Sequence, residues 1–322
     1  MKRILVTGGA GYVGAHTCKL LASSGYEPIT YDNLSTGHAD AVKWGPLITA
    51  DLHDSQKLID AFKKYQPLAV IHFAASAYVG ESVTNPFKYY ENNVGGTISL
   101  LGAMRSQNID KIVFSSTCAT YGLPDLKFIS EQCPQRPINS YGQSKLMIEK
   151  ILGDLAAQQQ LKHISLRYFN AAGDDKDGQI GERHDPETHL IPLAILSAFG
   201  GLELKIFGTD FATPDGTAVR DYIHVEDLGI AHILSIEHLL SGGTSDYINL
   251  GTGQGHSVRQ IISSLKDLGV KVKSSDAARR EGDPDYLVAD SSKAKTVLNW
   301  RPQYTKIEDI LKTAVHWHQQ NG

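Results

Sequence analysis

The segment T-G-G-A-G-Y-V-G, residues 7–14, constrains the fold of this 322-residue chain more than any other stretch. It follows a short β-branched run and opens a helical pattern, which places Gly8, Gly11 and Gly14 at a strand-to-helix turn. Glycines at such a turn let the backbone approach a pyrophosphate, and the following helix presents unpaired N–H groups to that anion. The segment therefore predicts a dinucleotide-binding βαβ unit.

Short β-branched runs alternate with helical patterns along the first 170 residues. This alternation predicts an α/β fold with a doubly wound parallel (Rossmann) sheet, covered by helices on both faces. After about residue 170 the pattern becomes irregular, and a smaller, mixed α/β substrate domain is expected there. The expected strands are residues 3–7, 28–31, 47–50, 69–73, 111–115, 163–169 and 247–250, and the expected loops are 171–189 and 207–217. The expected domains are 1–168 plus about 222–253, which binds the dinucleotide, and about 169–221 plus 254–322.

Composition narrows the classes of partner. The formal net charge is −4 and no run of Lys or Arg stands out, so neither nucleic acid nor an anionic membrane is expected as a partner. The longest apolar stretch is too short to span a bilayer and contains a proline. No signal-peptide pattern precedes the first strand, and Cys18, Cys118 and Cys133 form no C-x-x-C pair, so a cytoplasmic protein is expected. The spacing of His184 and His189 matches no known metal site, and no metal is expected.

An acidic residue at the end of the second predicted strand indicates which dinucleotide is bound. Asp32 lies 24 residues after Gly8, near the spacing at which a carboxylate accepts a hydrogen bond from the adenosine ribose. A carboxylate there repels the 2′-phosphate of NADP, and no arginine follows at once. The sequence therefore favours NAD.

Three further residues are candidates for catalysis. Tyr141 and Lys145 are four positions apart at the start of a predicted helix, so their side chains share one face. Thr117 follows the fifth predicted strand, whose carboxyl end lines the cofactor crevice of a doubly wound sheet. A tyrosine pKa of about 10 is too high for a base at neutral pH, but a lysine and a positive nicotinamide ring lower it. Tyr141 is then expected to accept a hydroxyl proton while hydride leaves the same carbon.

These residues and several longer motifs resemble the extended short-chain dehydrogenase/reductases. The segments T-G-G-A-G-Y-V-G, H-F-A-A, S-S-T and Y-x-x-x-K are typical of that family as a whole. Longer segments are similar to the UDP-glucose 4-epimerases within it: V-G-E-S-V, Y-Y-E-N-N-V, L-R-Y-F-N, V-R-D-Y-I-H-V and R-R-E-G-D. The resemblance runs nearly end to end and includes both predicted domains.

The resemblance implies a homodimeric enzyme that interconverts UDP-glucose and UDP-galactose with tightly bound NAD. It implies transient oxidation at the sugar C4, rotation of the 4-keto sugar and return of hydride to the opposite face. The implied cofactor-binding residues are Gly8, Gly11, Tyr12, Val13, Gly14, Asp32, Asn33, Asp51, Leu52, Phe73, Ala74, Ala75, Asn92, Thr117, Tyr141, Lys145 and Tyr168. The implied substrate-binding residues are Thr117, Tyr141, Phe169, Asn170, His189, Leu190, Phe207, Arg220, Arg280, Asp283 and Leu287.

Four positions depart from the pattern of the resembled family, and at one of them Thr117 replaces the commoner serine and keeps the hydroxyl. Ala77 stands where many bacterial members carry a lysine, so the tuning of Tyr141 is expected to depend more on Lys145. His189 stands where asparagine is frequent, and Leu287 replaces a tyrosine that limits the sugar pocket in some members. Leu287, as a smaller residue, leaves a UDP-N-acetylglucosamine 4-epimerase as one alternative. The segments A-Y-V-G-E-S and S-S-T-C-A-T-Y-G resemble the branch that includes UDP-arabinose 4-epimerases, so a UDP-arabinose/UDP-xylose 4-epimerase is another.

Other functions are weighed against the same residues. A nucleotide-sugar 4,6-dehydratase or decarboxylase needs an extra acid/base pair directly after Thr117, but Cys118 and Ala119 follow it. A non-catalytic NAD-binding sensor usually lacks the tyrosine or the lysine, and both are present here. Net oxidoreduction of a soluble substrate would require exchangeable cofactor, which the motifs for UDP binding disfavour.

Overall fold

The main sheet has seven parallel strands in the order β10-β6-β5-β4-β1-β2-β3, in a computed structural model that describes residues 2–321. All seven strands expected from the sequence are present, and the predicted doubly wound parallel α/β architecture is confirmed. The strands are β1 (Lys2–Thr7), β2 (Tyr26–Asp32), β3 (Leu47–Thr49), β4 (Ala69–His72), β5 (Lys111–Thr117), β6 (Lys162–Tyr168) and β10 (Asp246–Leu250).

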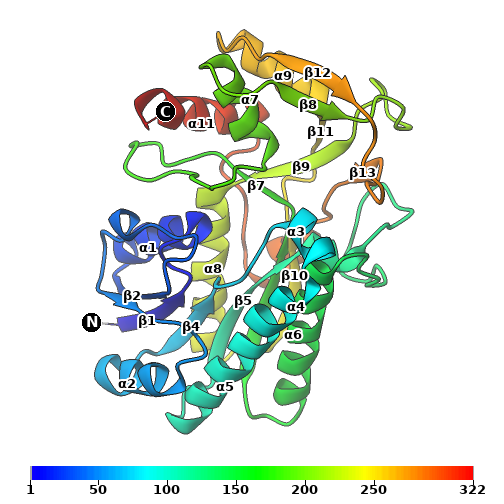
Figure 1. The fold of residues 1–322 in the computed structure, drawn as a ribbon. Coiled ribbons are helices and arrows are strands. Elements are labelled where there is room, and N and C mark those ends of the chain that lie inside the picture. Colours follow the sequence, from blue (N-terminus) through cyan, green and yellow to red (C-terminus); the bar gives the residue numbers. More distant parts are fainter. Residues whose placement is uncertain (1, 322) are drawn as a thin grey trace.

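Helices cover both faces of this sheet, as Figure 1 shows. Strand β1 illustrates why, because alternate side chains of a strand point to opposite faces. Ile4 and Val6 join an apolar core with α1 and α8, whereas Leu5 joins a second core with α2, α5 and α6. These helices are α1 (Tyr12–Ser23) and α8 (Val225–Leu240) on one face, and α2 (Ser55–Tyr65), α5 (Gly96–Ser106) and α6 (Ser140–Ala157) on the other.

A smaller lobe stands over the carboxyl ends of the main strands (Figure 1). Its central strand β9 (Val219–His224) pairs parallel with β7 (Asn170–Ala172) and β13 (Tyr286–Leu287), and antiparallel with β11 (Gly255–Ser257). A separate parallel pair joins β8 (Leu204–Phe207) to β12 (Ser274–Ala277). Helices α7 (Leu190–Ala198), α9 (Val258–Asp267) and α11 (Ile307–Asn321) form the apolar core of this lobe.

Two short connections fix the smaller lobe over the sheet. Strand β6 continues through Phe169 directly into β7, and β9 continues directly into α8. The segment after the last strand of the smaller lobe packs back against the main sheet's helices. Trp300 in this segment is buried in the core with α8, and its Nε1–H donates to the Asp227 carbonyl at 3.0 Å. Residues 173–189 and 208–218 contain neither helix nor strand, as expected from the sequence apart from the strand ends at Ala171–Ala172 and Phe207.

The other helical segments are short. They are α3 (Val79–Thr84), α4 (Pro86–Tyr89), α10 (Ser292–Val297), a π-helical turn (Tyr90–Gly95) and two 3₁₀ turns (Ala39–Ala41 and Cys118–Tyr121). Within residues 2–321, none of the helices combines the length and the apolar character needed to cross a membrane.

Candidate active site

The glycine loop between β1 and α1 depends on the absence of side chains. Gly8 has φ +71°, and a Cβ there would lie 2.5 Å from the Ala74 nitrogen. A Cβ at Gly14 would collide with the Gly8 carbonyl. Helix α1 begins after Gly11 without a side-chain cap and without an acidic residue in its first turn. Its first N–H groups, beginning at Tyr12 and Val13, are therefore available to an anion.

Three polar residues gather at the ends of β2 and β3. The Asp32 carboxylate accepts hydrogen bonds from the backbone N–H groups of Leu34 at 2.8 Å and Ala10 at 3.0 Å. Burial raises the pKa of Asp32, and these two bonds act in the opposite direction. The side-chain amide of Asn33 donates to Asp51 at 2.8 Å. Asp32, Asn33 and Asp51 thus occupy the edge where the sequence places the adenosine end of the dinucleotide.

The chain after β4 borders the glycine loop. The N–H groups of Phe73 and Ala74 both donate to the Thr7 carbonyl, at 2.9 and 3.1 Å. Asn92 lies in the π-helical turn, where its amide donates to Asn93 Oδ1 at 3.0 Å. Strands β1 and β4 are neighbours at the point where the strand order reverses, which is where doubly wound sheets bind nucleotides. Ala75 directly follows Ala74 in the chain after β4, and Leu52, just after β3, packs against the core that includes α5.

Thr117 and Tyr168 end two adjacent strands and are paired in register. The Thr117 hydroxyl oxygen accepts a hydrogen bond from the Ala119 N–H at 3.1 Å. The Tyr168 hydroxyl lies 2.7 Å from Ser115 Oγ. Phe169 follows Tyr168 and is buried. The carboxyl ends of β5 and β6 therefore place Thr117 and Tyr168 side by side, with the Tyr168 hydroxyl against Ser115.

Tyr141 and Lys145 lie on the first turns of α6, which Asn139 caps by accepting a hydrogen bond from the Gly142 N–H at 2.8 Å. Lys145 Nζ is 5.9 Å from the centroid of the Tyr141 ring and donates to the Ser115 carbonyl at 2.8 Å. Lys145 is 2% exposed, and this is its one hydrogen bond to other side chains or carbonyls within residues 2–321. An ammonium has three N–H donors, so two are free to hold a ligand's hydroxyl groups.

Burial dominates the electrostatics of this pair. Burial raises the pKa of Tyr141 above its ordinary value and Tyr168 adds to the effect, whereas the neighbouring Thr117 hydroxyl lowers it. Burial lowers the pKa of Lys145 to about 7, although Glu149 opposes the change. The chain alone therefore keeps the pKa of Tyr141 above its ordinary value, and the lowering expected from Lys145 together with a bound nicotinamide stays a prediction. The physical reason is that desolvation disfavours the phenolate and the ammonium alike.

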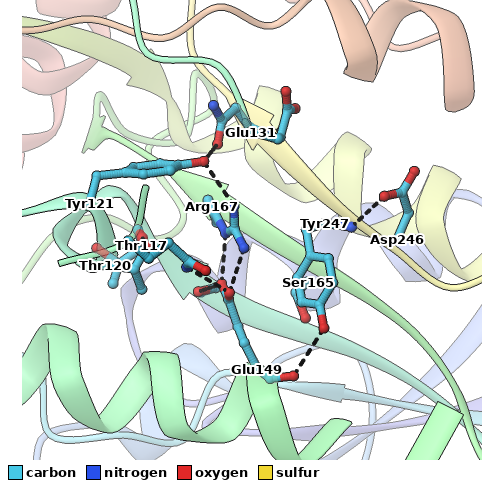
Figure 2. Close-up of polar contacts among 12 residues, drawn as sticks. Thr117, Thr120, Tyr121, Glu131, Glu149, Ser165, Arg167, Asp246 and Tyr247 are labelled. Atoms are coloured by element: carbon cyan, nitrogen blue, oxygen red, sulfur yellow. Dashed lines mark hydrogen bonds and ion pairs between the residues drawn. The ribbon is translucent and has the colours of Figure 1, made fainter. Parts of the chain in front are cut away.

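Glu149 and Arg167 form a buried ion pair, shown in Figure 2, that was not predicted from the sequence. Glu149 binds Arg167 through two contacts, 2.6 Å from NH2 and 2.9 Å from Nε, and both side chains are almost fully buried. Arg167 also donates to the Tyr121 hydroxyl at 2.9 Å. Glu149 lies one helical turn after Lys145, just as Lys145 lies one turn after Tyr141. That repeated four-residue spacing was the available sequence signal.

The smaller lobe contributes Arg220 and its partners. The Arg220 guanidinium donates to Asp283 at 2.7 Å and to the Pro284 carbonyl at 2.9 Å. Leu287 pairs in register with Arg220 and packs against a small apolar cluster near the end of β5 that includes Cys118 and Phe169. The structure therefore links the predicted pyrophosphate ligand Arg220 to the strand end that carries Thr117.

Arg280 has a different partner from Arg220. Its guanidinium stacks 3.8 Å from the centroid of the Phe207 ring. Arg280 and Asp283 line a cleft of about 710 Å³ between residues 123–127 and 279–286, and neither Arg220 nor Tyr141 is part of its lining. Asn170 begins β7 below this lobe.

His189, predicted to contact substrate, is engaged by carboxylates. It occupies the N-cap position of α7, directly before Leu190, and its Nδ1 lies 2.9 Å from both Glu182 and Glu187. Burial lowers the pKa of His189, but these carboxylates outweigh burial and raise it to about 10. The sequence analysis missed this engagement because the acids lie two and seven residues upstream in a segment without regular structure.

The residues present fit NAD. An uncapped helix N-terminus follows the glycine loop, a carboxylate stands at the end of β2, and a buried ammonium with free donors stands near the end of β5. These positions suit a pyrophosphate, a ribose diol and a second ribose, respectively.

Comparisons with known proteins agree with this geometry. Residues 4–251 match the NAD dependent epimerase/dehydratase family. A UDP-glucose 4-epimerase of Rhizobium meliloti is 50% identical over 321 residues, which are 99% of this chain and 98% of that protein. The crystal structure of UDP-glucose 4-epimerase from Brucella ovis in complex with NAD is 52% identical, has a TM-score of 0.96 and is matched over 98% of each chain. A UDP-glucose-4-epimerase from Stenotrophomonas maltophila, crystallised with bound NAD and formylated UDP-arabinopyranose, is 37% identical with a TM-score of 0.97, over 100% of this chain and 99% of that one.

Proposed function

The chain belongs to the NAD dependent epimerase/dehydratase family, and from that premise we propose that it is an enzyme that interconverts UDP-glucose and UDP-galactose. One observation carries the proposal: Tyr141, Lys145 and Thr117 meet at the carboxyl end of β5, two strands from the glycine loop. The nearby binding positions fit NAD, and UDP-sugars are the substrates of the similar proteins.

Tyr141 moves the proton of the reaction. When bound, NAD would supply a reversible hydride acceptor for the sugar C4 and a positive ring that favours the Tyr141 phenolate. The Tyr141 oxygen takes the proton of the sugar 4-hydroxyl and gives it back after the sugar has turned. The Thr117 hydroxyl hydrogen-bonds the same sugar oxygen and so fixes its distance from the phenol. Lys145 donates its free N–H groups to the nicotinamide ribose, which places the ring beside C4.

The smaller lobe holds the UDP part while the sugar turns. We assign the two lobes to residues 1–168 plus about 222–253, and about 169–221 plus 254–322. Arg220 and Arg280 suit a pyrophosphate because each guanidinium can bind two oxygens, with Asn170, Leu190, Phe207 and Asp283 around them. Leu287 and Phe169 border the sugar, since both pack near the end of β5. For Arg220 and Arg280 to share one ligand, the ligand must bridge from the 279–286 cleft to β9.

The chemistry after Thr117 disfavours a dehydratase. Such an enzyme needs a second proton-transfer group there, but Cys118 and Ala119 begin the 3₁₀ turn. Burial raises the pKa of the Cys118 thiol to about 12, so it stays protonated at neutral pH. The presence of both Tyr141 and Lys145 likewise favours an enzyme over a cofactor-binding sensor.

We further propose that the protein is a homodimer that pairs through α5 and α6. Exposed apolar side chains gather along this side, with Val83 66%, Phe87 72% and Ile98 55% exposed, and Met147 37% exposed on α6. Light scattering should give twice the mass of one chain, and Ile98→Asp should reduce the mass to that of one chain.

The three cysteines are free thiols, in keeping with a reducing cytoplasm.

Replacing Tyr141 tests the proposed function. Tyr141→Phe removes the proton acceptor but keeps the ring, so turnover of UDP-galactose should fall at least about 100-fold while NAD stays bound. Tyr65→Phe, on α2 away from the site, is the matched control and should keep full activity. A Tyr141→Phe variant with near-normal turnover would refute the assignment.

A further inference from the structure

Four side chains in the loop before α7 converge on one point. Glu182, His184, Glu187 and His189 each direct one oxygen or nitrogen atom inward, and these four atoms all lie within 4.8 Å of one another. We propose that this cluster binds a divalent transition-metal ion, with Zn²⁺ as the best match. The proposal concerns a site that is separate from the hydride chemistry.

The distances suit tetrahedral coordination. Zn²⁺ binds histidine nitrogen and carboxylate oxygen at about 2.0–2.2 Å, so its ligand atoms lie about 3.3–3.5 Å apart. His184 Nδ1 is 3.2 Å from Glu182 and 3.4 Å from Glu187. His189 Nδ1 is 2.9 Å from each of the same carboxylates. A metal at the centre would need these four histidine–carboxylate distances to lengthen by at most about half an ångström.

The alternative, a cluster of hydrogen-bonded ion pairs, accounts poorly for the angles. Of the four histidine–carboxylate contacts, only that between His189 and Glu187 is aligned as a hydrogen bond. His184 Nδ1 is buried and has no hydrogen-bond partner within residues 2–321, despite two carboxylates within 3.4 Å. These nitrogen and oxygen atoms lie close together but are not aligned as hydrogen-bond donors and acceptors. Ligand atoms around a shared metal ion have this arrangement.

The two carboxylates of the cluster require positive charge nearby. Glu182 is 3% exposed, and neither it nor Glu187 forms an ion pair with a lysine or arginine in the part of the chain that the structure describes. A buried carboxylate is normally paired with a cation or coordinates a metal, so Glu182 and Glu187 need positive charge either from protonated His184 and His189 or from a metal bound by the neutral rings. Two carboxylates and two imidazoles form a donor set that suits Zn²⁺, whereas Mg²⁺ and Ca²⁺ prefer oxygen ligands throughout.

The location suggests what the ion would do. His189 directly precedes α7, so an ion here would tie the irregular 173–189 loop to the start of that helix. The His184 ring lies 6.2 Å from the rings of both Tyr12, the first residue of α1, and Tyr78. The bound ion would thus brace the smaller lobe against the glycine loop, and we expect it to stabilise the fold.

Metal binding by the purified protein tests this directly. After chelator treatment and buffer exchange, wild-type protein incubated with ZnCl₂ and then dialysed should retain about one Zn²⁺ per chain by elemental analysis. The Tm should rise with Zn²⁺ and not with Mg²⁺. Co²⁺ in place of Zn²⁺ should give the strong visible absorption bands of a tetrahedral ion. His184→Gln and Glu187→Gln should each weaken Zn²⁺ binding by about 100-fold or more, beyond the loss usual for an outer-shell partner.

A histidine outside the cluster serves as the control. His316→Gln changes an exposed histidine on α11 outside the cluster and should bind Zn²⁺ as the wild type does. Retention of Zn²⁺ by His184→Gln at wild-type affinity would overturn the site, as would wild-type protein that retains none. If a variant fails to fold, the Co²⁺ spectrum of the wild type decides alone. Epimerase activity enters none of these readouts, so this test is independent of the proposed function.

Discussion

At the residue scale, burial controls the chemistry of α6. Tyr141 and Lys145 both lose hydration, which raises the pKa of the tyrosine and lowers the pKa of the lysine to about 7. The chain alone thus keeps the Tyr141 phenol protonated at neutral pH. The active protonation state therefore depends on the charge that the bound cofactor brings, and this coupling favours an enzyme that retains its cofactor through turnover.

The pKa of Lys145 predicts a pH dependence of stability. The folded-state pKa of about 7 lies below the ordinary value of 10.5, so between these values the unfolded chain binds more protons. The free energy of unfolding contributed by this residue therefore rises with pH across that window, and below about 7 the buried charge is a constant cost. Cofactor-free wild type should gain up to a few kcal/mol relative to Lys145→Met between pH 7 and 9.5 in urea unfolding. A constant difference between the two proteins would contradict the buried-ammonium interpretation.

Leu287 predicts the size of the sugar that the site admits. It lies beside Phe169 near the end of β5, where a larger side chain would intrude on the sugar. Leu287→Tyr should lower kcat/KM for UDP-N-acetylglucosamine by at least about 10-fold more than for UDP-glucose, whereas Leu287→Met should affect both little. Equal losses on the two substrates would show that Leu287 does not limit the pocket.

At the element scale, α6 is held by the ion pair between Glu149 and Arg167. Both side chains are buried, so Glu149→Gln leaves a guanidinium without its counter-charge and should reduce the free energy of unfolding by about 3–5 kcal/mol. The half-buried surface pair of Arg3 and Glu27 supplies the control, and Glu27→Gln should cost less than about 1 kcal/mol. Similar losses in both variants, measured by chemical denaturation, would refute a special role for the buried pair.

Elements differed in how well the sequence predicted them, and burial explains the difference. The strands of the main sheet are covered on both faces, so they read as continuous apolar runs such as Ile4–Val6 and were predicted within a few residues. The small strands β11, β12 and β13 have two to four residues each, and β12 is largely exposed. Such short segments are too brief to carry a periodic pattern. They are strands because they pair with β8 and β9.

The same distinction holds for the candidate site. The glycine loop and the pair Tyr141 and Lys145 are local patterns, visible in a few consecutive residues. The Glu149–Arg167 pair joins α6 to β6, and the convergence of Glu182 with His189 depends on the path of an irregular loop. These contacts arise from tertiary structure, so the sequence shows the residues but not their meeting.

At the scale of the whole molecule, the account is that two lobes enclose a cofactor that the enzyme reoxidises itself. The glycine loop and Asp32 come from the main sheet, whereas Arg220 and Leu287 come from the smaller lobe above it. The chain passes between the lobes repeatedly, through β6–β7 and β9–α8, which ties their relative position to the main fold. Because the hydride returns to the sugar, a cofactor held between the lobes is regenerated in each turnover, and no second substrate is needed.

The most direct test is to incubate the purified protein with UDP-galactose and no added cofactor or reductant, and to follow the anomeric protons by NMR. The account predicts conversion to UDP-glucose until the two sugars reach equilibrium, with NAD released from the protein on denaturation. No conversion, even after NAD is supplied, would contradict the assignment of this site as an epimerase.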